Sequence, residues 1–288
     1  MTLLTTTSDV SGVLPPEFAA LIEEPLADEA LAFNPAVATV VRTGSTDLIV
    51  PIVREDAGAA WVAEGADIVP DDAVFDQLTI TPPKVAGLTK ASREILDDSS
   101  PSAREILGRG LARSIAAKVD NSFFASLAAP APGGLESLDT EAITLVESNG
   151  FANLDPFAEA IAEMEQAGGT VTSFVTDPDT ALAIAQLKDE SGSLRPLLGV
   201  DATNGTARQV LGVPLFVSRF VTEGTVWALD ASANLVVVRE GTTLAISADR
   251  YFDSDSIAVR ATARVGFGFP ILSRVVKVAE IPEDPGED

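Results

Sequence analysis

The pattern of hydrophobic and polar positions changes several times along the chain. Residues 1–35 carry single apolar positions among threonines and prolines, without a repeat that could build a core, which indicates an extended N-terminal arm. Residues 36–53 and 75–89 alternate between apolar and polar positions, the first around a Thr-Gly-Ser turn and the second around Leu78 and Ile80. Alternation with a period of two predicts strands. Residues 36–53 give two short strands that lead toward residues 59–72, and residues 75–89 give one that returns from them.

The stretch between these strands has an unusual composition. Residues 59–72 read AAWVAEGADIVPDD, in which one of the two tryptophans precedes four acids: Glu64, Asp67, Asp71 and Asp72. The strands and this tip together predict a two-stranded loop of about 30 residues that reaches roughly 40 Å. Because an isolated hairpin is only marginally stable in water, we expect the loop to lie against another protein surface.

The clearest helical pattern covers residues 99–127, SSPSAREILGRGLARSIAAKVDNSFFASL. Ser100 is placed to cap this helix with Pro101 at its first position, and the stretch APAPGGL ends it. One apolar stripe recurs at every fourth residue: Leu107, Leu111, Ile115, Val119 and Phe123. Basic residues follow the same helix, and we interpret them as a solvated or partner-facing side rather than an anion site: Arg104, Arg109, Arg113 and Lys118.

From about residue 150 onward, helical and strand patterns alternate. Asp155 is placed to cap one helix that Gly168 ends, and a second Asp-Pro start at Asp177 opens another. Strand patterns follow, and those within residues 256–281 alternate basic with apolar positions. The elements together predict an α+β fold, with a compact α+β unit over residues 150–245.

The charge balance and the missing residue types exclude several classes of protein. The 288 residues include 43 acids and 19 bases, a net charge of −24, which disfavours binding along a nucleic-acid backbone. Cysteine and histidine are both absent, which rules out disulfides, Cys-His and Ser-His-Asp catalysis, and the commonest metal ligand. The chain start lacks the pattern of a signal peptide, and no long apolar stretch predicts a membrane span.

Candidate chemistry is sparse. The acid pairs at 71–72 and 97–98 could form an acid/base or divalent-metal site, but so acidic a chain places neighbouring acids in solvated turns by chance. The sequence GFGFP at 266–270 lacks the third glycine of a phosphate-binding loop and is typical of a twisted strand or bulge. We therefore predict a protein that is not an enzyme, with no catalytic residue, cofactor or metal site. Its projecting segments are completed by copies of the same chain.

Several motifs follow one another in a specific order. A Trp-Val-x-Glu-Gly stretch occupies residues 61–65, a Pro-Lys pair follows at 83–84, and SREILDDS fills residues 92–99 ahead of the long helix. Further on come TDPDTALAIAQLKDESGSLRPLL, VLGVPLFVSRFV and SIAVRATARVGFGFPILSRVVKV. In this order and spacing the chain resembles the major capsid proteins of tailed bacteriophages with the HK97 fold.

The resemblance implies that the chain divides into the parts of an HK97-like capsid fold. These are an N-terminal arm (1–35), peripheral-domain strands (36–49), an extended loop (50–84), a peripheral domain with a long spine helix (85–149), an axial domain (150–245), and peripheral-domain strands with the C-terminal tail (246–288). It implies a subunit that assembles with itself into hexamers and pentamers of an icosahedral virion shell around double-stranded DNA, which it does not bind sequence-specifically. Assembly would take place in the host bacterial cytoplasm, and portal, scaffolding and decoration proteins are partners that the resemblance allows.

The same resemblance gives the extended loop a role at subunit contacts. As a hypothesis, Trp61 anchors the loop on a neighbouring subunit, and acids of the loop meet bases there. The contacting residues would be Trp61, Glu64, Asp67, Asp71, Asp72, Arg104, Arg109, Arg113 and Lys118. Some family members cross-link subunits through a loop lysine. Residues 54–82 contain none and Lys84 lies on the return strand, so we predict a shell without covalent cross-links.

Other classes of protein stay open at this point. Encapsulins use the same fold and enclose a cargo protein, although the loop and Ser-Arg-Glu motifs favour the phage interpretation. An acidic monomeric enzyme, such as a two-carboxylate glycosidase, would leave residues 1–35 and 50–84 unexplained. A surface adhesin is disfavoured because the chain shows no export signal.

Overall fold

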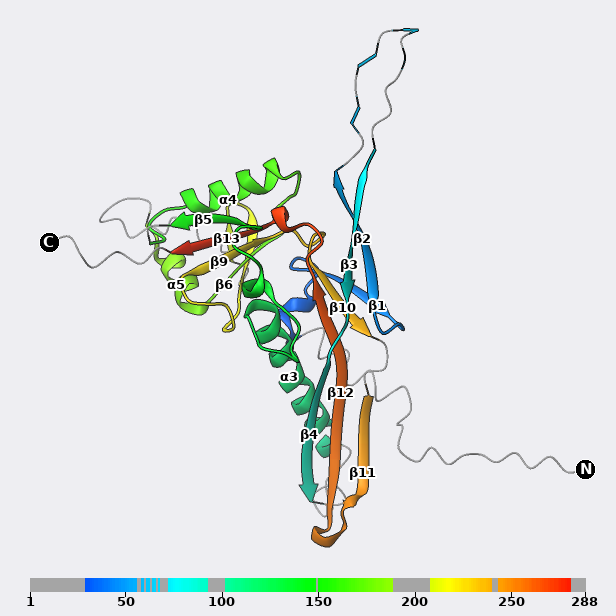
Figure 1. Ribbon diagram of the computed structural model, residues 1–288. Coiled ribbons are helices and arrows are strands. Elements are labelled where there is room, and N and C mark those ends of the chain that lie inside the picture. The colour runs from blue at the N-terminus through cyan, green and yellow to red at the C-terminus, as the bar shows by residue number, and fades with distance from the viewer. Residues whose placement is uncertain are drawn as a thin grey trace, which may run out of the picture.

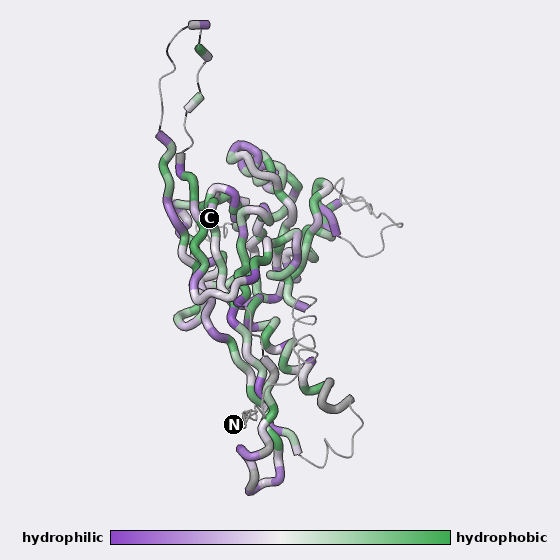
Figure 2. Tube along the Cα trace, turned by 90° about the vertical axis from the view of Figure 1, so that its right-hand side faces the viewer, coloured by the Kyte–Doolittle hydropathy of each residue, from purple (hydrophilic) through white to green (hydrophobic). Residues whose placement is uncertain are grey.

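The computed structural model describes residues 29–55, 58–59, 61–62, 64–65, 67, 72–92, 102–148, 150–188, 208–239 and 243–280. Figure 1 shows a broad body at one side, a tapering part below it built around one long helix, and a two-stranded hairpin that projects away from both. Apolar positions follow the paired strands through the body and the tapering part (Figure 2). The architecture mixes helices and sheets, as the predicted α+β class requires.

The body is organised around a six-stranded mixed sheet with the order β5-β13-β9-β6-β8-β7. Its strands are β5 (Thr144–Ser148), β6 (Ser173–Thr176), β7 (Gln209–Val210), β8 (Val213–Val217), β9 (Thr225–Leu229) and β13 (Val275–Glu280). Helices α4 (Asp155–Gln166) and α5 (Pro178–Gln186) accompany this sheet. Phe157 of α4 packs edge-to-face on Phe174 of β6, with ring centroids 5.3 Å apart, inside a fully buried cluster.

The two helices of the body start differently. Asp177 caps α5 as predicted, because its carboxylate accepts the backbone N–H groups of Asp179 and Thr180 at 2.9 and 3.0 Å. The predicted cap of α4 is wrong, since Asp155 already lies in the first turn and Leu154 occupies the cap position without a side-chain hydrogen bond. A carboxylate in the first turn still stabilises the helix dipole, which explains why the pattern looked like a cap.

The tapering part contains a second, five-stranded sheet. It is formed by β1 (Thr39–Thr43), β4 (Lys84–Ser92), β10 (Leu235–Arg239), β11 (Thr243–Tyr251) and β12 (Ser256–Gly268). The long strand β12 is its axis: β10 and β11 pair with it along one edge and β4 along the other, while β1 pairs in parallel with β10. Alternate residues of β12 are buried between its basic positions, as the sequence pattern predicted.

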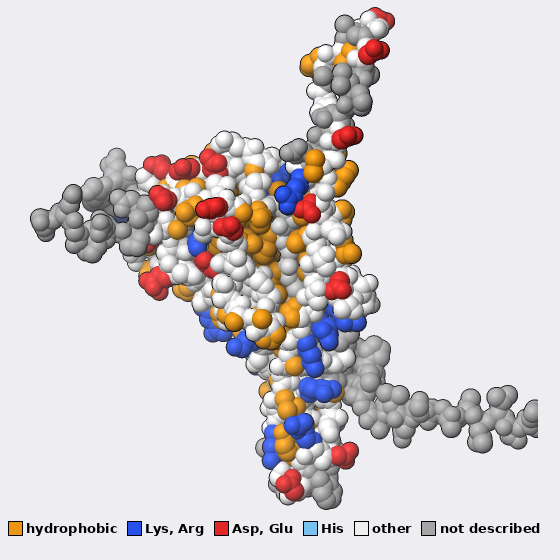
Figure 3. All heavy atoms as spheres, viewed as in Figure 1, with side chains coloured by type: hydrophobic (Ala, Val, Ile, Leu, Met, Phe, Trp, Pro, Cys, Tyr) orange, Lys and Arg blue, Asp and Glu red, His pale blue; other side chains and the backbone are white. Residues whose placement is uncertain are grey.

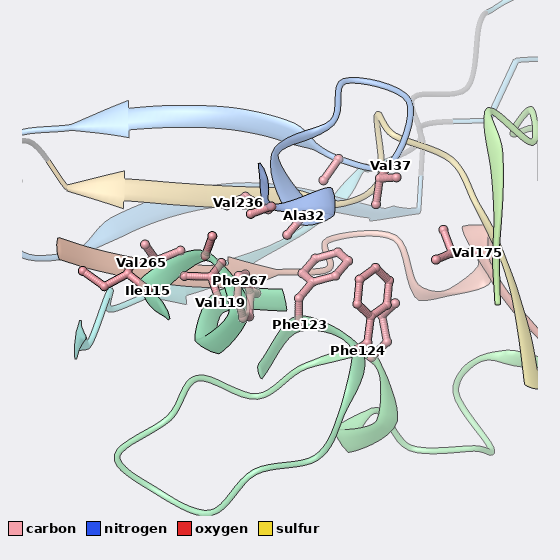
Figure 4. Close-up of a cluster of buried hydrophobic side chains, with 14 of the residues drawn as sticks. Ala32, Val37, Ile115, Val119, Phe123, Phe124, Val175, Val236, Val265 and Phe267 are labelled. Atoms are coloured by element: carbon pink, nitrogen blue, oxygen red, sulfur yellow. The ribbon is translucent and has the colours of Figure 1, made fainter. Parts of the chain in front are cut away.

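Helix α3 (Ser102–Phe124) packs on one face of this second sheet. Four members of the predicted stripe are buried in the core and Leu107 is half-buried: Leu111, Ile115, Val119 and Phe123. Figure 4 shows Phe123 and Phe124 projecting from the end of α3 into a cluster that also holds Phe267. Their rings meet edge-to-face at centroid distances of 5.1 and 5.0 Å. The helix ends three residues earlier than predicted, and the predicted cap at residues 100–101 lies outside the described residues.

A buried acid on α3 connects the helix to the segment that precedes the first strand. Asp120 is 6% exposed, and its carboxylate accepts the backbone N–H groups of Leu31 and Ala32 at 3.0 and 2.9 Å. Burial raises the pKa of Asp120, and the two hydrogen bonds partly offset this effect. The last residues of the predicted arm therefore contribute to the core, where Ala30 and Ala32 are buried. Residues 1–28 lie outside the described residues.

The projecting hairpin is formed by β2 (Leu48–Glu55) and β3 (Val74–Ile80), which pair only with each other within the described strands. The predicted outgoing and returning strands are confirmed. At the base of the hairpin, Ile80 and Pro82 pack closely against Gly266 and Gly268 of β12. The GFGFP stretch is thus the end of a strand whose glycines admit the hairpin, and the interpretation as a strand is confirmed.

Strand pairing groups the chain differently from the continuous segments predicted above. Strand β5, from predicted segment 85–149, and β13, from predicted segment 246–288, both join the six-stranded sheet. Strand β10, from predicted segment 150–245, joins β1 and β12 in the other sheet. These pairings join residues far apart in the sequence, which local patterns do not encode. The assignment of peripheral and axial roles to the two parts stays a prediction.

Candidate inter-subunit surface

The hairpin exposes large apolar side chains that no described residue of the chain covers. Trp61 is 106% exposed, whereas the second tryptophan, Trp227 of β9, is 0% exposed. Phe75 at the start of β3 is 70% exposed, and Val62 and Val74 are exposed as well. Single exposed apolar residues are ordinary, but a tryptophan and a phenylalanine on one projecting element are typical of a surface that another molecule covers.

The tip of the hairpin is acidic. Of the acids predicted to make contacts, Glu64, Asp67 and Asp72 are exposed, and Asp71 lies outside the described residues. Figure 3 shows acidic side chains distributed along the projecting loop. The tip therefore combines an exposed tryptophan with negative charge, a combination that suits a basic, partly apolar receptor.

The single base within residues 54–82 is already used within the hairpin. Arg54 on β2 forms an ion pair with Asp76 on β3, with Nη2 and Oδ2 2.6 Å apart. The pKa of Asp76 is lowered, first by the backbone N–H of Gln77 and then by Arg54. Both side chains are largely exposed, so the pair contributes little to stability. Because Arg54 is engaged by Asp76, Glu64 and Asp67 have no basic partner in the part of the hairpin that the structure describes.

The basic residues predicted on α3 lie on its solvent side. Arg109, Arg113 and Lys118 are exposed, while the side chain of Arg104 lies outside the described residues. The hairpin points away from α3, so the structure does not bring these bases and the loop acids together within one chain (Figure 1). Any pairing between the two sets must be made between chains, and it stays a prediction.

A second set of bases, which the sequence analysis did not single out, lies on the five-stranded sheet. Lys84 of β4 and Arg264 of β12 are direct cross-strand neighbours, and Arg260 stands opposite the exposed Leu88. Val85 and Ala263, the next residues along each strand, belong to the core beside α3, so these bases lie on the other face of the sheet. Like charges directly opposite each other destabilise a sheet. The sequence signal for this positively charged face was the four-residue spacing of Arg260 and Arg264, which places both side chains on the same face of a strand.

Sites for other chemistry do not emerge from the described residues. Within them, no group of three or more acidic side chains is placed to hold a metal ion. None of the helices in the described part of the chain is long and apolar enough to cross a membrane. Of the two acid pairs weighed above, only Asp72 is described, and it is exposed.

The structure combines a long helix on one sheet, a body built on a second sheet and a projecting hairpin. This combination is an HK97-like capsid fold, and comparison with solved structures agrees. The capsid of a native GTA particle matches with a TM-score of 0.70 and 20% identity, over 98% of this chain and 96% of that one. A chain from Mycobacterium phage Adephagia matches with a TM-score of 0.71 and 17% identity, over 89% of this chain and 92% of that one. At these identities the likeness shows the fold.

The sequence also assigns the family. The profile of the phage capsid family matches residues 11–277, and the chain belongs to this family. A capsid polyprotein of Pseudomonas phage PAJU2 is 27% identical over 192 residues, which cover 64% of this chain and 28% of that protein. The chain thus spans little more than a quarter of that relative's length.

The protein is a structural subunit of a phage capsid shell, and its place is in the virion. The phage family fits the chain better than the encapsulin alternative.

Proposed function

We propose that the chain assembles with copies of itself into pentamers and hexamers of an icosahedral shell that encloses double-stranded DNA. The observation that carries the proposal is Trp61, fully exposed on a hairpin whose base packs on β12 and whose strands pair only with each other among the described strands. A neighbour that covers the hairpin would remove its apolar side chains from water and would stabilise an element that is marginal alone. The part around α3 would be the peripheral domain and the six-stranded body the axial domain.

We propose that the contacts between subunits are non-covalent and that the chain catalyses no reaction. Residues 54–82 contain no lysine, and Lys84 begins β4 at the base of the hairpin rather than near its tip. A cross-link from the loop tip through a lysine is therefore not available to this chain. Stability would come from burial of Trp61 and from pairs between loop acids and bases of a neighbour.

The net charge of −24 supports a passive relation to the enclosed genome. A negatively charged wall repels the phosphate backbone, so DNA would be held by confinement and not by sequence-specific contacts. Assembly in the host cytoplasm, together with a portal and any scaffolding or decoration protein, belongs to the same proposal.

The purified chain, examined by negative-stain microscopy and sedimentation velocity at neutral pH, tests the proposal. Hollow particles, or pentamers and hexamers, are the expected result. A species of 29.9 kDa at every concentration, together with phage particles whose shell lacks this chain, would contradict it. Co-purification of a cargo protein in place of DNA would instead support the encapsulin alternative.

A further inference from the structure

A groove of about 500 Å³ opens between the start of β4, the last turns of α3 and the loop that follows α3. Its floor is apolar and buried, with Val119 of α3 and Val265 of β12. Its walls come from residues 83–86 and from the Ala- and Pro-rich residues 127–132. The volume lies within the range of pockets that bind a compact ligand or one large side chain.

The rim of the groove is positively charged. Lys84 and Lys118 line it from opposite sides, both are exposed, and neither forms an ion pair within the described residues. The groove therefore suits a segment that presents a large apolar side chain between acids.

The edge of β4 supplies hydrogen-bonding groups beside the groove. Among the described strands β4 pairs only with β12, and no described strand covers its other edge, where backbone N–H and C=O groups point outward. Backbone groups at such an edge can form a hydrogen bond with the polar group of a side chain whose apolar part enters the groove. The indole N–H of tryptophan usually requires such an acceptor when it is buried.

The chain itself carries a segment with the matching chemistry. Trp61 is fully exposed, and Glu64 and Asp67 follow it within six residues. The hairpin cannot deliver this segment to the groove of its own chain, because the seven residues of β3 separate the tip from the base by about 23 Å. Figure 1 also shows the hairpin pointing away from α3 and β4. The segment can therefore reach such a groove only on a second copy of the chain.

We infer that the groove between β4, α3 and residues 127–132 receives Trp61 of a second copy of this chain. The inference rests on the proposed function, to which it adds the receiving site. The indole enters between Val119 and Val265, and its N–H donates to a carbonyl at the β4 edge. Glu64 and Asp67 of the incoming loop lie against Lys84 and Lys118 at the rim, where they fix the register of the contact.

Carbodiimide cross-linking of assembled wild-type particles tests this site without any substitution. The reagent joins a carboxylate to an amine only where the two are in contact, and mass spectrometry identifies the linked peptides. We expect links from Glu64 or Asp67 to Lys84 or Lys118. Links from these carboxylates only to lysines elsewhere, such as Lys277 on β13, would overturn the inference while leaving shell assembly intact.

Introduced cysteines give a second test, since the natural chain has none. The pair Val62→Cys and Ala128→Cys places one thiol beside Trp61 and one in the groove wall, within the roughly 7 Å between Cα atoms that a disulfide needs if the inference holds. The matched control combines Val62→Cys with Ala128 unchanged and Ala158→Cys, an exposed alanine on α4.

In oxidised particles the groove pair should run as multimers on a non-reducing denaturing gel, and the control should remain monomeric. Particles of the groove pair that stay monomeric, or cross-link no more than the control, would contradict the groove as receptor. Failure of the wild-type chain to form any particle or capsomer would instead contradict the proposed function. If the cysteine variants do not assemble, the carbodiimide result on wild-type particles decides.

Discussion

Ile80, the last residue of β3, packs directly on Gly268, the last residue of β12. A Cβ on Gly268 would lie 2.9 Å from Ile80 Cγ1 and 3.1 Å from Leu78 Cδ2, closer than side chains tolerate. A Cβ on Gly266 would likewise lie 3.0 Å from Pro82 Cα. The two glycines thus let the base of the hairpin sit on the sheet, and they fix the direction in which the hairpin leaves the molecule.

Gly268→Ala should lower the stability of the subunit and disturb the hairpin. The added methyl group collides with Ile80, and overpacking of this kind costs about 1–3 kcal/mol. Denaturant unfolding of the unassembled subunit measures the loss. Gly110→Ala on α3 is the matched control, because its nearest neighbour is an Arg113 nitrogen at 4.0 Å, and we expect unchanged or slightly higher stability. Equal stability of Gly268→Ala and the wild type would show that Ile80 leaves room for a side chain at position 268.

Asp120→Asn should destabilise the fold because it disturbs the acceptor of the Leu31 and Ala32 N–H groups. Loss of hydrogen bonds to a buried charged acceptor costs about 2 kcal/mol. The exposed Glu159→Gln on α4 serves as the control and should change little. An Asp120→Asn subunit as stable as this control would mean that the carboxylate does not hold the segment before β1.

The difference in stability between the wild type and Asp120→Asn should depend on pH in a definite direction. Burial raises the pKa of Asp120 above 3.8, so the folded state binds its proton more tightly than the unfolded state. The contribution of Asp120 is therefore complete below pH 3.8 and declines as the pH rises through the raised pKa. The wild type should gain stability relative to Asp120→Asn as the pH is lowered from neutral. A difference that shrinks on acidification would contradict the raised pKa.

Trp61→Ala should leave the isolated subunit unchanged and weaken the shell. The side chain makes no buried contact in one chain, so its removal costs the fold nothing, whereas buried tryptophans at interfaces contribute about 2 kcal/mol or more each. Thermal scans of subunits and of particles separate the two effects. Ile106→Ala, another exposed apolar residue, is the control. Shells of Trp61→Ala as stable as wild-type shells would refute the anchoring role.

Boiled particles should run as monomers near 29.9 kDa on a denaturing gel. The reason is chemical, since the loop between residues 54 and 82 contains neither lysine nor cysteine that could link covalently to a neighbour. A ladder of higher bands that survives boiling would show a cross-link formed from another part of the chain.

Much of the local structure could be predicted from the sequence. The stripe of α3, the Asp177 cap and the strands of the hairpin follow from periodicity and capping rules, because neighbouring residues determine them. Exposure of Trp61 could be predicted too, since Gly65 and Pro70 prevent the tip from packing on itself. Family motifs extended the prediction to the fold class.

The missed features depend on residues far apart in the chain. Strand β13 joins β5 and β9, and no local pattern distinguishes this from pairing with β12. The positive charge on the face of the sheet away from α3 was missed for the same reason: Lys84 and Arg264 become neighbours only in the register of β4 with β12. Asp120 lies next to the apolar stripe of α3, and its partners are nearly ninety positions away in the sequence.

A cryo-EM reconstruction of assembled particles would show where each hairpin lies. We predict that the hairpin of each subunit, β2 and β3 with the tip between them, lies over a neighbouring subunit with Trp61 buried in the contact. A shell in which Trp61 faces solvent, or in which the hairpin folds back on its own chain, would contradict it.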